Sequence, residues 1–259
     1  MSLFRKMANP AYKPYEAELE KEVRAGGIPE HVAIIMDGNR RYAREVMGEE
    51  ASQGHVKGKD KFEEVTRWCL DLGVKYLTVY AFSVENFSRS QEEVDMLMDL
   101  ISSALIELAD SEEVQRYRPC IRVIGDRSII PENLYKAVEY AENKTKDYDG
   151  CCLSIAIAYG GRQEIVGAVR EISRKVKEGE IDIDDINEEM LSDHLSTKEI
   201  PDPDLVLRTS GEVRVSNFLL WQIAYSELYF TDVYWPGFRR IDLLRAIRTY
   251  QQRKRRYGA

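Results

Sequence analysis

Residues 31–41 have the sequence His-Val-Ala-Ile-Ile-Met-Asp-Gly-Asn-Arg-Arg, and the rest of the chain is organised around them. Its apolar run, residues 32–36, is rich in β-branched types and predicts a strand buried on both faces. The strand ends at Asp37, as expected at the carboxyl edge of a sheet, where open α/β folds bind ligands. A carboxylate suits Mg²⁺ there, and Arg40 and Arg41 suit diphosphate oxygens. These residues alone fit equally well an ordinary strand-to-helix turn that Asp37 caps.

The composition indicates a globular chain without a nucleic-acid partner. Its 259 residues are 44% hydrophobic and 32% charged, enough for one large α/β domain or two small ones. The formal net charge of −8 argues against general nucleic-acid binding. Any anion site must therefore come from local clusters of arginine.

Cysteine usage and the lack of apolar segments indicate a cytoplasmic protein. No Cys-x-x-Cys pair occurs, so we expect reduced core cysteines rather than disulfides or zinc ligands: Cys69, Cys120, Cys151 and Cys152. No apolar run approaches the ~20 residues of a membrane-spanning helix. Residues 1–9 lack the apolar core of a signal peptide.

Strand and helix patterns alternate through most of the chain and predict one α/β domain with a mostly parallel central sheet flanked by helices. We expect an N-terminal extension with a short helix at residues 1–27 and the main domain at 28–259. Further strands are expected at 74–82, 121–124, 152–158, 205–208 and 228–230. Helices are expected at 15–25, from just after Gly58 to about 72, and at 91–110, 131–146, 162–177, 184–195 and 241–255. Residues 48–54 are polar and rich in helix breakers, which predicts a mobile segment.

Polar clusters follow two more of the expected strands. Residues 83–89 (Ser-Val-Glu-Asn-Phe-Ser-Arg) follow one strand, and residues 208–217 carry two arginines and three hydroxyls after another. If the strands are parallel, these clusters meet beside Asp37 and form a diphosphate site with a divalent cation. The alternative is that each arginine is a solvated loop charge.

Two further features leave open alternatives. The helix at 91–110 is apolar nearly all round, so it is either simply buried or lines an apolar channel. His55 lies between two glycines and near two lysines, which fits a surface or capping histidine as well as a phosphate contact.

Several nucleotide and hydrolase motifs are absent from the sequence. It contains no Gly-x-x-x-x-Gly-Lys-Ser/Thr loop and no Gly-x-Gly-x-x-Gly after the first strand. It also lacks a serine–histidine elbow and the Asp-Asp-x-x-Asp motif of trans-prenyltransferases.

The chain resembles the cis-prenyltransferases, the undecaprenyl-diphosphate-synthase-like family. The resemblance covers roughly residues 28–258, with the motifs in family order. They are His31–Ala43, Gly54-His55, Tyr80–Arg89, Tyr159–Arg162 and Pro203–Asp232.

The resemblance implies catalytic roles for Asp37 and Asn86, and a Mg²⁺ cofactor held by Asp37 and Glu227. Asn86 would assist diphosphate departure and proton removal. The implied substrate-binding residues are Gly38, Asn39, Arg40, Arg41, Tyr42, His55, Ser83, Val84, Glu85, Phe87, Arg89, Arg208, Arg214, Val215 and Ser216. The implied substrates are an allylic prenyl diphosphate and isopentenyl diphosphate, the latter held by Arg208, Arg214 and Ser216. The product would be a cis-polyprenyl diphosphate, grown in an apolar tunnel.

The resemblance also implies a homodimer and transient membrane contact for the product. Residues 256–258 (Arg-Tyr-Gly) look like the family's tail, which reaches the neighbouring subunit's site. Departures from the family are Tyr42 and Phe87, where many members have tryptophan, and Ala51, where many have arginine.

Two other functions compete with this one. A non-catalytic partner subunit of such an enzyme would share the fold, but such partners typically lack the Asp-Gly-Asn motif. A Mg²⁺-dependent phosphatase is weaker, since no second acid follows Asp37 at two residues.

Overall fold

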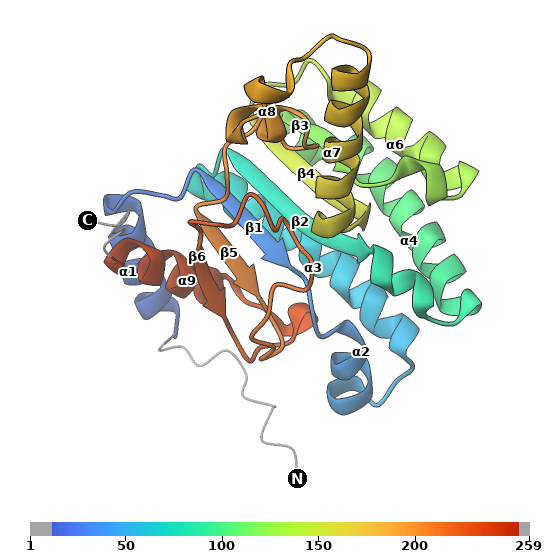
Figure 1. The fold of residues 1–259 in the computed structure, drawn as a ribbon. Coiled ribbons are helices and arrows are strands. Elements are labelled where there is room, and N and C mark those ends of the chain that lie inside the picture. Colours follow the sequence, from blue (N-terminus) through green and yellow to red (C-terminus); the bar gives the residue numbers. More distant parts are fainter. Residues whose placement is uncertain (1–11, 254–259) are drawn as a thin grey trace.

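A six-stranded parallel sheet forms the centre of the computed structural model, which describes residues 12–253 (Figure 1). The strand order is β3-β4-β2-β1-β5-β6, and every neighbouring pair is parallel. The strands are β1 (His31–Ile35), β2 (Tyr76–Ser83), β3 (Pro119–Ile124), β4 (Cys151–Tyr159), β5 (Leu205–Arg208) and β6 (Glu227–Phe230). This confirms the predicted fold class and places each predicted strand within two residues of its expected bounds.

Helices connect the strands and cover the sheet (Figure 1). They are α1 (Tyr12–Ala25), α2 (Asn39–Tyr42), α3 (Ala51–Leu72), α4 (Gln91–Asp110), α5 (Glu112–Tyr117), α6 (Glu132–Thr145), α7 (Gly161–Lys177), α8 (Glu188–Asp193) and α9 (Arg240–Gln252). A π-helix, Ala43–Met47, follows α2, and short 3-10 turns include Val84–Ser88, Ile183–Asp185 and Trp235–Gly237. The helix predicted at 184–195 is therefore shorter and follows a 3-10 turn.

Alternate side chains of the strands enter two different cores, as the strand repeat of two requires. On one face, residues such as Ile34 and Leu153 pack with α1, α3, α4, α6 and α9. On the other face, Ile35 and Val206 pack with Phe218 and its neighbours after β5. All four cysteines are free, as predicted.

Helix α3 corrects one expectation. The segment predicted to be mobile, residues 48–54, ends inside this helix, which begins at Ala51 and contains Gly54 and Gly58. A Cβ on Gly54 would lie 2.1 Å from the Asn39 carbonyl oxygen. These glycines therefore let α3 pack directly against the backbone that follows β1, rather than breaking the helix.

Helix α1 belongs to the same core as the sheet. Leu19 and Val23 are fully buried in it, and Glu20 accepts hydrogen bonds from Arg240 of α9 at 2.7 and 2.9 Å. The boundary expected at residues 27 and 28 remains a prediction about sequence organisation. Within residues 12–253, no helix has the length and apolar character to cross a membrane.

We expect that Leu153→Ala lowers the free energy of unfolding by about 2–5 kcal/mol, because it leaves a cavity in the core that packs against β4. Leu153 has no exposed surface. Chemical denaturation measures the change. Ile129→Ala is the control, since that side chain is 46% exposed, and it should change stability by less than about 0.5 kcal/mol. Equal losses in the two variants would contradict the packing described above.

Candidate active site

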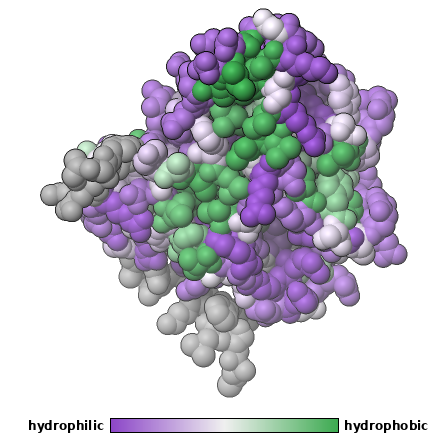
Figure 2. Space-filling model, viewed as in Figure 1, coloured by the Kyte–Doolittle hydropathy of each residue, from purple (hydrophilic) through white to green (hydrophobic). Residues whose placement is uncertain are grey.

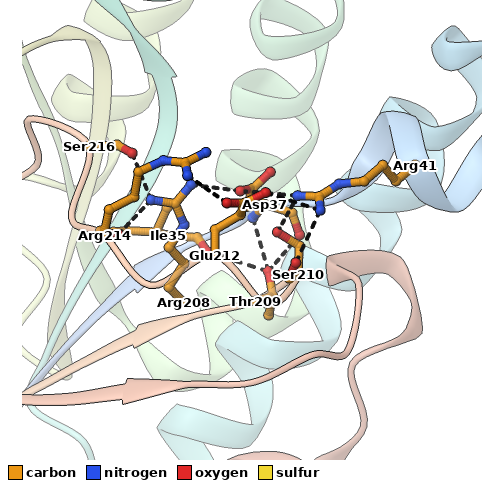
Figure 3. Close-up of polar contacts among 9 residues, drawn as sticks. All are labelled: Ile35, Asp37, Arg41, Arg208, Thr209, Ser210, Glu212, Arg214 and Ser216. Carbon is orange, nitrogen blue, oxygen red and sulfur yellow. Dashed lines mark hydrogen bonds and ion pairs between the residues drawn. The ribbon is translucent and has the colours of Figure 1, made fainter.

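Asp37 lies just beyond the carboxyl end of β1, beside the end of β5 (Figure 3). Its backbone N–H donates to the Thr209 hydroxyl at 3.0 Å, and that hydroxyl donates to the Asp37 carbonyl at 2.6 Å. The N-cap of α2 is Gly38, and it makes no side-chain capping bond. Asp37 is therefore held by the neighbouring strand and does not cap the helix, so the alternative left open by the sequence is wrong.

The Asp37 carboxylate forms an ion pair with Arg208, the last residue of β5. Arg208 Nη2 donates to Asp37 Oδ2 at 2.7 Å, and Arg208 Nη1 donates to the Ser216 hydroxyl at 2.6 Å. Arg208 is only 4% exposed. Burial raises the pKa of Asp37, but hydrogen bonds from Arg208 and Ser210 outweigh it and hold that pKa below its usual value. Asp37 is thus an anion at neutral pH.

Arg41 approaches the same carboxylate from the other side (Figure 3). Its Nη2 lies 3.7 Å from Asp37 Oδ2 and donates to the Ser210 hydroxyl at 2.7 Å. Glu212 pairs with Arg41 at 3.2 Å and with Arg214 at 2.5 Å. One acid is therefore surrounded by guanidinium groups from two separate segments, as the sequence predicts.

Two arginines and a histidine gather around Glu93 at the first turn of α4. Glu93 Oε1 lies 3.0 Å from Arg89 Nη1, 3.6 Å from His55 Nε2 and 3.7 Å from Arg40 Nε. Nearby, Asn86 Oδ1 accepts a hydrogen bond from the Ser83 backbone N–H at 3.0 Å. That contact occupies the oxygen of the Asn86 amide and leaves its NH₂ group as a donor.

His55 is a buried residue of α3, 9% exposed, which rules out the surface alternative. Its Nε2 forms no hydrogen bond with the described residues. Burial, together with the positive charge of Arg89, lowers the pKa of His55 to about 4. The imidazole is therefore neutral at physiological pH, with a ring nitrogen available to a ligand.

These clusters line one polar cavity of about 540 Å³. Its wall contains residues from all three predicted clusters: Asp37, Asn39, His55, Ser83, Glu85, Asn86, Arg89, Arg208, Arg214 and Ser216. A groove lined by Gly38, Arg40, Arg41, Arg44, Arg89 and Glu212 adjoins it at Asp37, Asn39 and His55. The three segments therefore meet, as parallel strands require.

An apolar cavity of about 100 Å³ adjoins the polar one. The two share Met36, Asn39, His55, Tyr80, Ala81 and Leu97 in their walls. One wall of the apolar cavity is the face of α4 that carries Leu97, Leu100, Ile101, Ala104, Leu105 and Leu108. Of the two alternatives for this helix, the structure supports the one in which a face lines an apolar channel.

Some predicted site residues lie outside these cavities. Tyr42 lies beside Gly237, where an added Cβ would be 3.4 Å from its ring, and Phe87 packs edge-on against Phe82 with ring centroids 4.9 Å apart. Val84 and Val215 also do not line the polar cavity. Residues 256–258, the expected tail, lie outside the described residues.

Glu227, the second metal ligand implied by the resemblance, lies apart from Asp37 in the chain described here, and its role as a metal ligand stays a prediction. It begins β6 and pairs in register with Leu205, whereas Ile35, just before Asp37, pairs with Arg208. Because β6 is parallel to β5, its first residue lies toward the opposite edge of the sheet. Glu227 instead pairs with Arg253 at 2.6 Å.

Three further residues of the site are not predicted from the sequence: Glu93, Ser210 and Glu212. Glu93 could have been found, because it follows Arg89 by four residues at the expected start of a helix, where such pairs form. Ser210 and Glu212 lie in the predicted anion loop, but nothing in the sequence distinguishes their contacts with Arg41.

The side chains present suit a Mg²⁺ ion that is held mainly by a bound diphosphate. Within residues 12–253, no group of three or more acidic, histidine or cysteine side chains could hold a metal. Asp37 supplies one carboxylate, 31% exposed, at the wall of the polar cavity. Mg²⁺ commonly binds through one or two carboxylates together with water and substrate phosphates. The residues present therefore fit Mg²⁺ bound together with a diphosphate.

Comparison with known proteins gives consistent matches. Residues 35–258 match the family model described as putative undecaprenyl diphosphate synthase. A tritrans,polycis-undecaprenyl-diphosphate synthase (geranylgeranyl-diphosphate specific) of Methanocaldococcus jannaschii is 53% identical over 95% of this chain and 88% of its own length. The Thermoplasma acidophilum protein of the same name is 51% identical over the full length of both chains.

Solved structures agree with these matches. The crystal structure of lavandulyl diphosphate synthase from Lavandula x intermedia, in complex with dimethylallyl diphosphate, has a TM-score of 0.84. It is 40% identical and covers 92% of this chain and 100% of that chain. A probable undecaprenyl diphosphate synthase from Campylobacter jejuni has a TM-score of 0.73 at 30% identity, covering 90% of this chain and 100% of that chain.

The buried His55 predicts a pH dependence of stability. Its pKa is 6.5 when unfolded and about 4 when folded, so between these values the unfolded chain binds more protons. The free energy of unfolding should therefore fall as the pH is lowered through this range and be fully recovered above 6.5. His55→Gln should reduce this slope in urea unfolding. It should not abolish it, since burial also lowers the pKa of His31 to about 4. An unchanged slope would contradict the assignment.

Proposed function

The chain belongs to the undecaprenyl diphosphate synthase family and is a cis-prenyltransferase, and we propose that it extends an allylic prenyl diphosphate with isopentenyl diphosphate in a Mg²⁺-dependent reaction. One observation carries this proposal: a polar cavity lined by Asp37 and arginines adjoins an apolar cavity along α4. The first suits diphosphates, and the second suits a hydrocarbon chain.

Two anion sites account for the two substrates. We assign the allylic diphosphate to Gly38–Arg41, His55 and Arg89, because the apolar cavity begins beside Asn39 and His55. We assign isopentenyl diphosphate to the loop that carries Arg208, Arg214 and Ser216. Asp37 lies between the two sites and would hold Mg²⁺, which, when bound, neutralises diphosphate charge.

The condensation breaks the C1–oxygen bond of the allylic substrate and joins its C1 to C4 of isopentenyl diphosphate. Arg40, Arg41 and Arg89 stabilise the diphosphate that leaves, since donors arranged in advance favour the developing anion. The Asn86 NH₂ group is placed to donate to a diphosphate oxygen. Loss of a proton from C2 of isopentenyl diphosphate then gives the cis double bond. Because Asp37 and Asn86 both line the cavity, a non-catalytic partner subunit is the weaker assignment.

For the allylic substrate we propose geranylgeranyl diphosphate, and for the product undecaprenyl diphosphate. The support is the shared name of relatives that are 53% and 51% identical to this chain. Labelled isopentenyl diphosphate, incubated with allylic diphosphates of increasing length, tests this. Preferred extension of geranylgeranyl diphosphate to an eleven-unit product supports the proposal. No product from any allylic diphosphate would overturn it.

We also propose that the protein is a homodimer that contacts membranes transiently to release its product. Figure 2 shows hydrophobic residues in a band that runs from α7 and α8 over the segment between β5 and β6. In α7, Val166 and Val169 are 48% and 49% exposed. Surface of this kind often marks an interface, and a second copy would cover it.

Asp37→Ala should abolish condensation, because it removes the carboxylate between the two anion sites. It also leaves the buried Arg208 charge unpaired, which costs about 3–5 kcal/mol of stability. Asp37→Asn is the milder test, because its amide oxygen can still accept the hydrogen bond from Arg208 although the negative charge is gone. Product formation and circular dichroism are measured together. Wild-type turnover in a folded Asp37→Asn protein would exclude the proposed role.

Val169→Asp should shift the protein from dimer to monomer in analytical ultracentrifugation, because it puts a charge in the apolar band. Ile129→Asp is the matched control, since that side chain is 46% exposed in the 3-10 turn after β3. It should remain dimeric. A wild-type monomer, or identical behaviour of both variants, would contradict the proposed interface.

A further inference from the structure

Tyr234 contacts the segment after β1 at three points. It lies in the connection between β6 and α9 and is half-buried. The Arg41 guanidinium carbon is 5.6 Å from its ring centroid, within the range of a cation–π contact. A Cβ on Gly38 would lie only 2.9 Å from the edge of the same ring. The Tyr234 hydroxyl donates to Glu45 of the π-helix at 2.6 Å.

The neighbour of Tyr234 fixes the backbone at this place. The Trp235 backbone N–H donates to the Asp37 carbonyl at 3.0 Å, and its indole N–H donates to the Gly58 carbonyl at 2.9 Å. Trp235 is 1% exposed. The backbone that carries Tyr234 is therefore anchored to both β1 and α3, so the position of the ring is determined by the fold.

The backbone at Gly38 is packed too closely against its neighbours to carry a larger residue. Gly38 has a φ of 105°, a conformation that favours glycine, and a Cβ would also lie 3.0 Å from Ser210 Cβ. The loop after Asp37 is thus packed between Tyr234 and Ser210. Arg41, one turn later, is held by the same two residues.

Arg41 has polar partners besides the Tyr234 ring. Its guanidinium donates to the Ser210 carbonyl and hydroxyl and lies 3.2 Å from Glu212 Oε1. The Arg41 side chain is 32% exposed, so solvent competes for it as well. The contacts with Ser210 and Glu212 come from the other anion-site loop. The Tyr234 ring is a contact that holds the guanidinium face without occupying a hydrogen-bond donor.

We infer that Tyr234 is a positioning residue for the allylic diphosphate: its ring orients the Arg41 guanidinium, and its hydroxyl, bound to Glu45, fixes the ring. This inference rests on the proposed role of Arg41 in binding that diphosphate. Because a cation–π contact itself occupies none of the guanidinium N–H groups, it holds the side chain in place and still lets those groups donate to a ligand.

Three variants separate the ring from the hydroxyl. Tyr234→Leu removes the ring and should raise the KM for the allylic diphosphate about tenfold, with a smaller change in kcat. Tyr234→Phe keeps the ring and should raise that KM by a factor of only two or three. Glu45→Ala should match Tyr234→Phe. The KM for isopentenyl diphosphate should stay near that of the wild type in all three.

A double-mutant comparison tests whether Tyr234 acts through Arg41. Tyr234→Leu should add little when Arg41 is already alanine, since coupled residues are not additive. Thermal unfolding is measured alongside, because a purely structural role would lower stability and kcat in all variants together. If Tyr234→Leu fails to fold, Tyr234→Phe and Glu45→Ala still test the hydroxyl contact.

The outcomes distinguish this inference from the proposed function. An unchanged allylic KM in Tyr234→Leu, or full additivity with Arg41→Ala, would overturn the positioning role while the wild type still condenses its substrates. If Tyr234→Leu does not fold, a wild-type allylic KM in both Tyr234→Phe and Glu45→Ala would likewise overturn the positioning role. Absence of condensation by the wild type would instead overturn the proposed function.

Discussion

The ion pair between Asp37 and Arg208 is the contact on which the rest of the site depends. Arg208 is 4% exposed, and a buried guanidinium without a partner is strongly destabilising. The pairing of Ile35 with Arg208 in the sheet places the acid and the base side by side before any ligand arrives. The same arginine then fixes Ser216, so the loop after β5 is positioned from the strand outward.

The fold and the meeting of the three polar clusters follow from a simple rule. Parallel strands end at one edge, so polar residues that follow β1, β2 and β5 must share a cavity. Contacts made by loops follow no such rule. Tyr234 faces the site from a loop whose direction is set by packing, not by a repeat in the sequence. The strand rule does not account for Glu227, which lies at the start of a parallel strand and not at its end, so its role as a metal ligand stays a prediction of the resemblance.

The glycines of α3 also have a role that the sequence alone does not show. By composition, Gly54 and Gly58 indicate a break in the helix, and the sequence gives no sign of their neighbour. In the structure, the neighbour is Asn39, whose carbonyl and side chain occupy the space that two Cβ atoms would need. A glycine can therefore mark close packing between two segments, and only their tertiary contact shows which.

The acidic net charge of the chain is compatible with two diphosphate sites because the arginines there are neutralised internally. Glu93 faces Arg89 and Arg40, and Glu212 bridges Arg41 and Arg214. These carboxylates hold the guanidinium groups in place without a ligand, so little order has to be created on binding. The pairs are partly exposed, and such pairs contribute little net stability. A diphosphate carries more charge than one carboxylate, so it can take over these donors at small cost. Local pairing, rather than the overall field, therefore makes the anion sites.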